Sequence, residues 1–203
     1  GLDGTRASLR TRQGSAEIRV PLLGRGHLQN VVCAAAVALE LGVDLDTIVA
    51  RVATLQPSSR RGAIVRLPKG VTIIDDSYNS SPSALKASLD VVSRTWAARR
   101  IAVVGEMLEL GDLSESLHRE CGLVAANSRL AKLFTTGGEP ARVLGEAAIG
   151  AGQRASTVVH FDDSATAAPT IAEQISSGDV VLVKGSRGTR TDLVVERLTE
   201  VFG

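Results

Sequence analysis

The chain has 203 residues, of which 44% are hydrophobic and 22% are charged, a composition typical of globular domains that bury a core. Its 23 basic residues nearly balance its 22 acidic residues, which argues against general binding to nucleic acid or acidic membranes. No segment has the roughly 20 uninterrupted apolar residues of a membrane span, and the first residues lack the layout of a secretory signal. Together these features predict a cytoplasmic protein.

The first 67 residues predict a small unit of one hairpin and two helices. Strands are expected at Ala7 to Thr11 and Ala16 to Val20, with a Gln-Gly turn between them. Helical spacing runs from Leu28 to Leu39, and Asp44 is placed to cap a second short helix. So few elements bury a poor core alone, which indicates that residues 1–67 are a piece of a larger domain.

Residues 68–203 alternate short β-branched runs with helical segments, which predicts an α/β fold with a doubly wound, mostly parallel, Rossmann-like sheet. In such sheets ligands bind beyond the carboxyl ends of the strands, so the loops there are the candidate sites. Helices are expected near residues 82–95, 114–127, 139–151, 164–176 and 190–201. The predicted strands are Val71 to Asp75, Ile101 to Val104, Leu133 to Thr136, Thr157 to His160 and Val180 to Val183.

The loop that follows the first of these strands, residues 75–82, reads Asp-Asp-Ser-Tyr-Asn-Ser-Ser-Pro and is dense in polar groups. Ser81 and Pro82 fit the N-cap and first position of a helix, so they need no ligand to explain them. The same does not hold for Asp76, which can accept a hydrogen bond from a ribose hydroxyl, or for Tyr78, which can orient a polar substrate. A functional loop and a purely structural one remain equally open from local chemistry.

The loop after the last strand, Lys184 to Arg190, combines three cations with two glycines. Its lysine and arginine side chains can bind phosphate or carboxylate, although cationic loops are more often simply solvated. No complete catalytic or phosphate-loop motif is present in the chain.

A third strand-end loop, Gly105 to Gly111, is followed by Asp112 and Glu115 at the spacing of a capping box. His118 lies inside the next helix and is interpreted as a packed or surface histidine rather than a ligand. Cys33 and Cys121 are not spaced for metal binding and are expected to be buried free thiols.

Together these loops resemble the Mur ligase family. The match rests on Asp-Asp-Ser-Tyr-Asn at residues 75–79, on Gly105 to Gly111 with His118, which resemble the family's GDMxELG…H stretch, and on Val-Lys-Gly-Ser-Arg-Gly at residues 183–188. The motifs occur in the family's order, and the likeness extends from about Val20 to Leu198.

The resemblance implies an ATP-dependent ligase of three domains. Residues 1–67 would be the end of the central ATP-binding domain, and residues 68–203 the whole Rossmann-like C-terminal domain. The phosphate loop and the Mg²⁺ ligands of the family would lie upstream, so ATP and Mg²⁺ would be held mainly there. This chain alone would then be inactive, without a metal site or an assigned catalytic residue of its own.

The branch of the family that these motifs resemble joins D-alanyl-D-alanine to UDP-N-acetylmuramoyl-tripeptide through an acyl phosphate, in the synthesis of the peptidoglycan precursor. Two alternatives stay open. One is a sister ligase that adds another amino acid, although the Asp-Asn-Pro-Arg tetrapeptide of the diaminopimelate-adding relative is absent. The other is a stand-alone module that binds a nucleotide or an anion without catalysis.

Carried over residue by residue, the resemblance implies two sets of contacts. Glu106 replaces the family's aspartate, and Ser80-Ser81 replaces the end of its Asn-x-Asn-Pro loop. The implied ATP contacts are Asn30, which matches an adenine-binding asparagine, His27, which stands where the family has another asparagine, Arg61 and Asp76. The implied substrate contacts are Ser77, Tyr78, Asn79, Lys184, Ser186 and Arg187.

Overall fold

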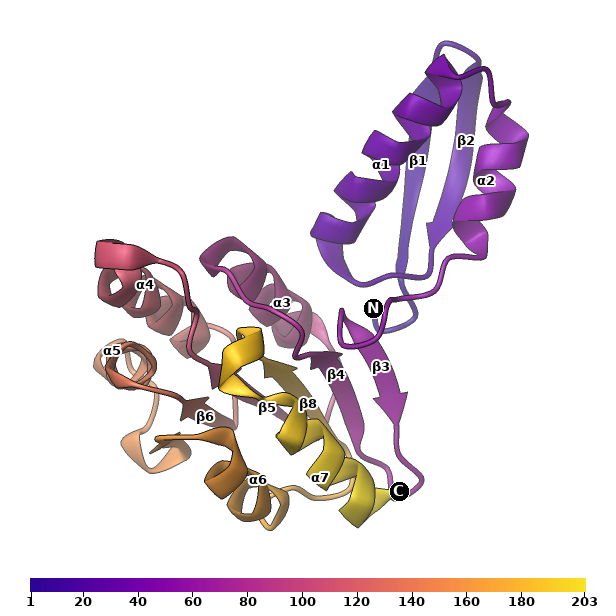
Figure 1. The fold of residues 1–203 in the computed structure, drawn as a ribbon. Coiled ribbons are helices and arrows are strands. Elements are labelled where there is room, and N and C mark those ends of the chain that lie inside the picture. The colour runs from indigo at the N-terminus through magenta and orange to yellow at the C-terminus, as the bar shows by residue number, and fades with distance from the viewer. The chain divides into compact units, whose positions relative to one another are not determined.

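A computed structural model describes residues 1–203 and divides them into two compact units, Gly1–Ser58 (unit 1) and Ser59–Gly203 (unit 2) (Figure 1). The predicted boundary at residues 67 and 68 falls inside unit 2, because a strand at Ala63–Arg66 pairs with the first strand of the following sheet. None of the helices combines the length and the apolar character that crossing a membrane requires.

Unit 1 contains the predicted hairpin and two helices. Apolar side chains from the strands and both helices form its core, among them Ile18, Val20, Val31 and Ile48. Asp44 caps the second helix as predicted, because its carboxylate accepts a hydrogen bond of 2.8 Å from the Thr47 amide. The elements are β1 (Thr5–Thr11), β2 (Gly14–Val20), α1 (Gly24–Glu40) and α2 (Leu45–Ala53), with β1 and β2 antiparallel.

Unit 2 is built on a six-stranded sheet in the order β3-β4-β8-β5-β6-β7. All neighbours pair in parallel except β3, which is antiparallel to β4, so the predicted mostly parallel α/β sheet is confirmed. The edge strand β3 was not predicted. The strands are β3 (Ala63–Arg66), β4 (Thr72–Asp76), β5 (Arg99–Gly105), β6 (Lys132–Thr136), β7 (Val158–Phe161) and β8 (Asp179–Lys184).

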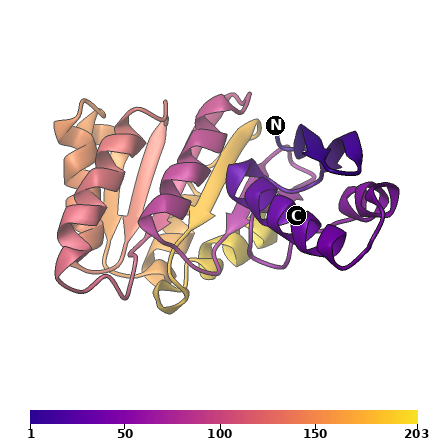
Figure 2. The same cartoon turned by 90° about the horizontal axis from the view of Figure 1, so that it is seen from above.

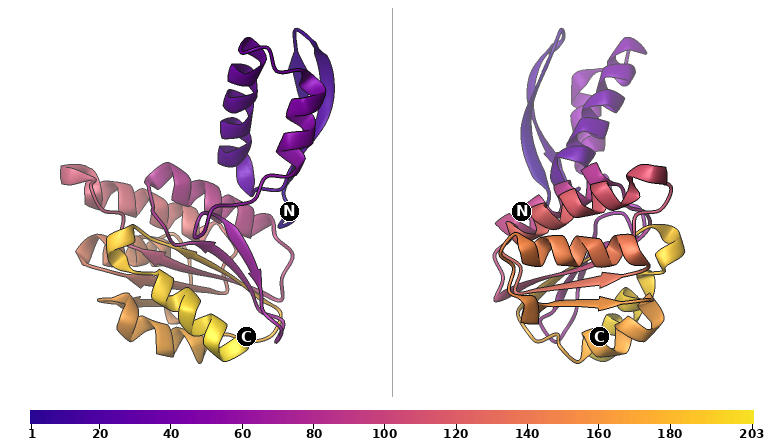
Figure 3. Two further views of the ribbon diagram at one scale, coloured as in Figure 1. Left: turned by 45° about the vertical axis from the view of Figure 1, so that its right-hand side comes forward. Right: turned by 90° about the vertical axis from the view of Figure 1, so that its left-hand side faces the viewer.

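Helices cover both faces of this sheet, as a doubly wound fold requires (Figures 2 and 3). Helices α3, α4 and α5 lie on one face, and α6 and α7 lie on the other. Ser81 caps α3 ahead of Pro82, as predicted. The helices are α3 (Pro82–Arg94), α4 (Ser114–Ala126), α5 (Glu139–Gly150), α6 (Ser164–Ala172) and α7 (Asp192–Phe202), with short 3₁₀ turns at Gly111–Leu113, Ala155–Thr157 and Arg187–Thr189.

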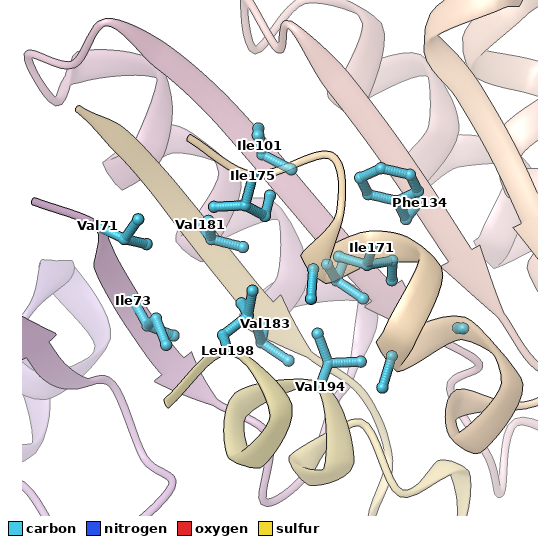
Figure 4. Packing of buried hydrophobic residues seen from close by; sticks show 14 of the residues in the cluster. Val71, Ile73, Ile101, Phe134, Ile171, Ile175, Val181, Val183, Val194 and Leu198 are labelled. Atoms are coloured by element: carbon cyan, nitrogen blue, oxygen red, sulfur yellow. The ribbon is translucent and has the colours of Figure 1, made fainter. Parts of the chain in front are cut away.

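The core between the sheet and helices α6 and α7 explains which way each strand residue points. Val181 and Val183 of β8 lie in this core together with Ile73 of β4 (Figure 4). Since successive side chains of a strand alternate between faces, Lys184 at the end of β8 and Asp76 at the end of β4 belong to the opposite face, which α3 covers.

The two cysteines are both free, but they differ in exposure. Cys121 on α4 is buried, as predicted, whereas Cys33 on α1 is exposed. The prediction for Cys33 was wrong because its apolar neighbours are exposed as well: Val32 and Val37 keep 41% and 61% of their surface accessible.

Candidate ligand-binding site

The carboxyl ends of β4 and β8 bring Asp76 and Lys184 together. The parallel register of the two strands pairs these residues directly, and alternation turns both side chains toward α3. The Lys184 ammonium lies 2.7 Å from Oδ2 of Asp76, and its side chain is 3% exposed. Two residues that are 108 positions apart in sequence therefore form one partly buried ion pair at the rim of the sheet.

This ion pair does not use all of its hydrogen-bonding groups within the chain. Lys184 also donates to the Asn79 carbonyl at 2.9 Å, which uses two of the three hydrogens of an ammonium. Oδ2 of Asp76 accepts from Lys184 and from the Ser88 hydroxyl at 3.0 Å, but Oδ1 makes no hydrogen bond within the chain. Because the Asp76 side chain is 19% exposed, a ligand at the rim can reach it.

The rest of the loop after β4 divides into an inward and an outward part. Ser77 is buried and donates its hydroxyl to Asp75 at 2.6 Å, so this predicted substrate contact points into the fold. Tyr78 is 38% exposed, and the Arg61 guanidinium carbon lies 4.0 Å from the centre of its ring. A cation stacked on an aromatic face at an exposed site contributes about 0.5–1 kcal/mol. This interaction keeps Arg61 and Tyr78, both predicted ligand contacts, side by side.

The loop after β8 is fastened to the loop after β5. Ser186 accepts a hydrogen bond from the Leu108 amide at 2.9 Å through its hydroxyl, and its own amide donates to the Glu106 carbonyl at 3.2 Å. Ser186 is buried, whereas Arg187 is exposed. Of the predicted substrate contacts in this loop, only Arg187 therefore presents its side chain openly to solvent.

Glu106 is engaged within the chain. Its carboxylate accepts a hydrogen bond of 2.7 Å from the Gly138 amide at the start of α5. A negative charge is stabilised at the N-terminus of a helix, where backbone amides lack helical partners. This contact ties the loop after β5 to the loop after β6.

His118 is fully buried and joins the same loop, which the sequence did not indicate. Its Nε2 accepts from the Met107 amide at 2.9 Å, and its Nδ1 donates to the Ser114 carbonyl at 2.7 Å. Burial lowers the pKa of His118, while the hydrogen bond to Ser114 and the charge of Glu106 oppose that shift.

The predicted nucleotide contacts Asn30 and His27 belong to unit 1, on α1. Asn30 is exposed, and Nδ1 of His27 lies 2.8 Å from the Leu23 carbonyl one turn earlier. Within unit 2, the structure brings Arg61 together with Tyr78 and Asp76 together with Lys184. The chain contains no cluster of three or more histidine, cysteine, aspartate or glutamate side chains arranged to hold a metal ion.

Ser88 is the residue at this site that sequence analysis missed. It lies in α3 between Leu85 and Leu89, which are both buried, so a hydroxyl on the apolar face of the helix was the available signal.

Comparisons with known proteins agree on one family. Residues 60–187 match the model of the Mur ligase glutamate ligase domain. The chain is 30% identical, over 89% of its length, to the UDP-N-acetylmuramoyl-tripeptide–D-alanyl-D-alanine ligase of Bacillus subtilis, and 31% identical, over 97%, to that of Escherichia coli. It spans only 39% and 42% of these two relatives.

Solved structures show the same likeness. The chain is similar to MurF ligase from Thermotoga maritima in complex with ADP, with a TM-score of 0.81 and 27% identity over 98% of this chain and 44% of that one. Crystal structure II of MurF from Acinetobacter baumannii gives a TM-score of 0.83 and 29% identity over 98% of this chain and 43% of that one.

Proposed function

Because this chain belongs to the Mur ligase family, we propose that it is the C-terminal part of an ATP-dependent ligase that joins D-alanyl-D-alanine to UDP-N-acetylmuramoyl-tripeptide in the cytoplasm. The observation that carries the proposal is the partly buried pair of Asp76 and Lys184, which keeps a free carboxylate oxygen and an unused ammonium hydrogen at the ligand rim. The names of the two relatives above support this choice of substrates.

In the proposed reaction the tripeptide carboxylate takes the γ-phosphoryl group of ATP, and the amine of the dipeptide then displaces phosphate. Mg²⁺, when bound, neutralises the charge of the transferring phosphoryl group. We assign the ribose hydroxyls of ATP to Oδ1 of Asp76, and an anionic oxygen of a substrate to the third hydrogen of Lys184. Tyr78 and Arg61 form one wall of the site, and the exposed Asn79 and Arg187 face the peptide substrates. Ser77 and Ser186, whose side chains are buried, hold the two loops in shape.

We propose that unit 1 is the end of the central ATP-binding domain and that Asn30 and His27 contact the nucleotide from there. Its two-stranded sheet and small core support this assignment. The exposed apolar side chains on α1 and at its C-cap support it further, since Val37 and Leu41 keep 61% and 79% of their surface accessible, as expected of a helix that packs against more of its own domain.

The test uses this chain joined to the upstream domains of the ligase. Phosphate release and the mass of the product are measured with ATP, Mg²⁺, the UDP-linked tripeptide and D-alanyl-D-alanine, and in parallel with meso-diaminopimelate or L-lysine and the UDP-linked dipeptide. We expect product only with D-alanyl-D-alanine. Product with another amino acid would identify a sister ligase instead.

Asp76→Ala tests the site assignment in the same assay. We expect kcat/KM to fall about 10- to 100-fold, the equivalent of one hydrogen bond to a charged group. Asp90→Ala is the matched control, because Asp90 is an exposed carboxylate on α3 that pairs only with Arg94. An Asp76→Ala enzyme as active as the control contradicts the assignment.

Calorimetry of the isolated chain separates the ligase from a stand-alone binding module. We expect weak or no binding of ATP, because the phosphate loop of the family is not in this chain. Tight binding of ATP by residues 1–203 alone would favour the module.

A further inference from the structure

The first three residues after β5 each use their backbone amide to hold a neighbouring element. The Glu106 amide donates to the Thr136 carbonyl at the end of β6 at 2.9 Å. The Met107 amide donates to His118 on α4, and the Leu108 amide donates to Ser186. Three consecutive amides therefore connect this loop to the ends of β6 and β8 and to α4.

His118 occupies a position where an apolar residue would serve packing alone. It is fully buried on the face of α4 that also carries Cys121 and Ala125, both 0% exposed. An apolar side chain there would leave the Met107 amide without its partner, and an unsatisfied buried amide costs about 1–3 kcal/mol. The histidine therefore satisfies a loop amide from inside a helix.

The two shortest hydrogen bonds of His118 define its protonation, since the contact of Nδ1 with the Ser114 hydroxyl is longer, at 3.5 Å. A carbonyl only accepts, so Nδ1 must carry the hydrogen that reaches the Ser114 carbonyl at 2.7 Å. Nε2 must then be bare to accept from the Met107 amide at 2.9 Å. The geometry requires the neutral Nδ1–H tautomer, because a second ring hydrogen would face the amide hydrogen of Met107.

We propose that His118 is a positioning residue that fixes the loop after β5 and, through the bond between Leu108 and Ser186, the loop that begins at Lys184. The role in positioning substrate rests on the proposed ligase function. His118 does not touch the proposed ligands: it acts through Met107 and Leu108 on Ser186, two residues beyond the Lys184 ammonium. Loss of the bond to Met107 frees the middle amide of the three and loosens both loops.

Nitrogen-15 NMR of the isolated chain tests the local part of this proposal without any activity. We expect the ring signals of a neutral imidazole protonated at Nδ1 and a slowly exchanging Met107 amide. In His118→Leu, exchange of the Met107 amide rises about tenfold or more, since the amide loses its partner. In His118→Gln, whose side-chain oxygen can accept in the place of Nε2, protection is largely restored. A ring protonated at Nε2, or unchanged exchange in His118→Leu, overturns the proposal.

His160→Gln is the matched control, because His160 is a partly buried histidine of unit 2 that bonds to the Thr135 side chain on β6 and to no residue of the loop after β5. We expect Met107 exchange to remain as in the unchanged protein. A rise as large as that in His118→Leu overturns the proposal, because it would show that any buried histidine change loosens the loop.

The ligase that contains the upstream domains tests the functional part. We expect His118→Leu to lower kcat/KM about tenfold and His118→Gln to recover most of that loss, with ATP hydrolysis and peptide-bond formation affected together. Changed Met107 exchange with unchanged kcat/KM overturns the positioning role. If the protein without substitutions is inactive although its Met107 amide is protected, the ligase function is contradicted. The hydrogen bond between His118 and Met107 is then still confirmed.

Discussion

Strand β8 begins and ends with a buried charge, and the two ends are built differently. At its start Asp179, 1% exposed, receives Arg99 on both carboxylate oxygens at 2.8 and 2.6 Å, and the Ser176 amide adds a third bond at 2.7 Å. At its end Lys184 reaches only Oδ2 of Asp76, and Oδ1 stays free. Both carboxylate oxygens of Asp179 therefore accept hydrogen bonds, whereas only one oxygen of Asp76 does.

Under the proposed function, the difference separates a pair within the fold from a pair that accepts a ligand. Both cross between neighbouring parallel strands, Arg99 to Asp179 from β5 and Asp76 to Lys184 from β4. A buried charge is tolerated when its hydrogen-bonding capacity is filled. Capacity left open at the carboxyl rim, where ligands bind in such sheets, indicates that something else fills it.

Arg99→Ala breaks the pair of Arg99 and Asp179 and should have the largest effect on stability. It leaves the Asp179 carboxylate buried without a countercharge, for which we expect a loss of about 3 kcal/mol in the free energy of unfolding of unit 2. Urea denaturation followed by circular dichroism measures it. Arg94→Ala removes an exposed pair with Asp90 and should cost under about 0.5 kcal/mol. Equal losses in the two variants would remove the distinction.

Lys184→Met breaks the pair of Lys184 and Asp76. It should lower the free energy of unfolding by less, about 1–2 kcal/mol. Asp76 keeps the Ser88 hydroxyl and reaches solvent through its exposed fraction, so its charge is not stranded. In the complete ligase the order should reverse: under conditions where both variants are folded, Lys184→Met should lower kcat/KM more than Arg99→Ala does. The same urea titration and the ligase assay decide both orders. A larger stability loss for Lys184→Met contradicts this view of the two ends.

Low pH should destabilise the loops beside the pair of Asp76 and Lys184, because His118 holds the loop after β5. Burial lowers the pKa of His118 below its ordinary value of 6.5 in the folded state. The unfolded chain therefore takes up a proton at a higher pH than the folded one does, and stability falls as the pH drops from about 7 through the unfolded pKa toward the folded one. Above that window His118 contributes no slope.

His118→Gln isolates this effect, since the glutamine does not titrate. Burial also lowers the pKa of His160, which contributes a slope of the same sign in both proteins, so the difference between the two stability curves belongs to His118. Urea midpoints between pH 5 and 8 measure it. Parallel curves for the variant and the unchanged protein would contradict the prediction.

The position of Asp76 and Lys184 at one rim followed from the sequence because parallel strands end there. Alternating strand and helix patterns predicted both strands, and the position of each polar loop after its strand was enough to place them at one edge of the sheet. The strand order that makes β4 and β8 neighbours was not predicted. Which side chain would bind which was not predictable. Lys184 was expected to face a ligand, and the structure gives two of its three hydrogens to Asp76 and Asn79.

Other features depended on tertiary contacts that local patterns do not encode. The strand β3 is only Ala63–Arg66, and its pairing with β4 decides where unit 2 begins. The capping box expected from Asp112 and Glu115 does not form. A 3₁₀ turn runs directly into α4, and Leu113 has helical dihedrals of −87° and −1° instead of the extended ones that a capping residue needs.

Ser88→Ala should give the smallest effect. The Ser88 hydroxyl has one hydrogen to share between Asp76 and the Ala84 carbonyl, each at 3.0 Å, so its removal should cost about 0.5–1 kcal/mol of unfolding free energy. Ser93→Ala is the control on the same helix, because that hydroxyl bonds only the Asp90 carbonyl at 2.8 Å.

If Asp76 is held for a ligand, Ser88→Ala should do more to function than to stability. Without Ser88, the Asp76 carboxylate is oriented by Lys184 alone and can rotate, so we expect KM for ATP to rise a few-fold in the complete ligase, while Ser93→Ala leaves it unchanged. Equal KM values for the two variants would show that Lys184 suffices to orient Asp76. The orientation of the free Oδ1 of Asp76 would then depend on the ion pair with Lys184 alone.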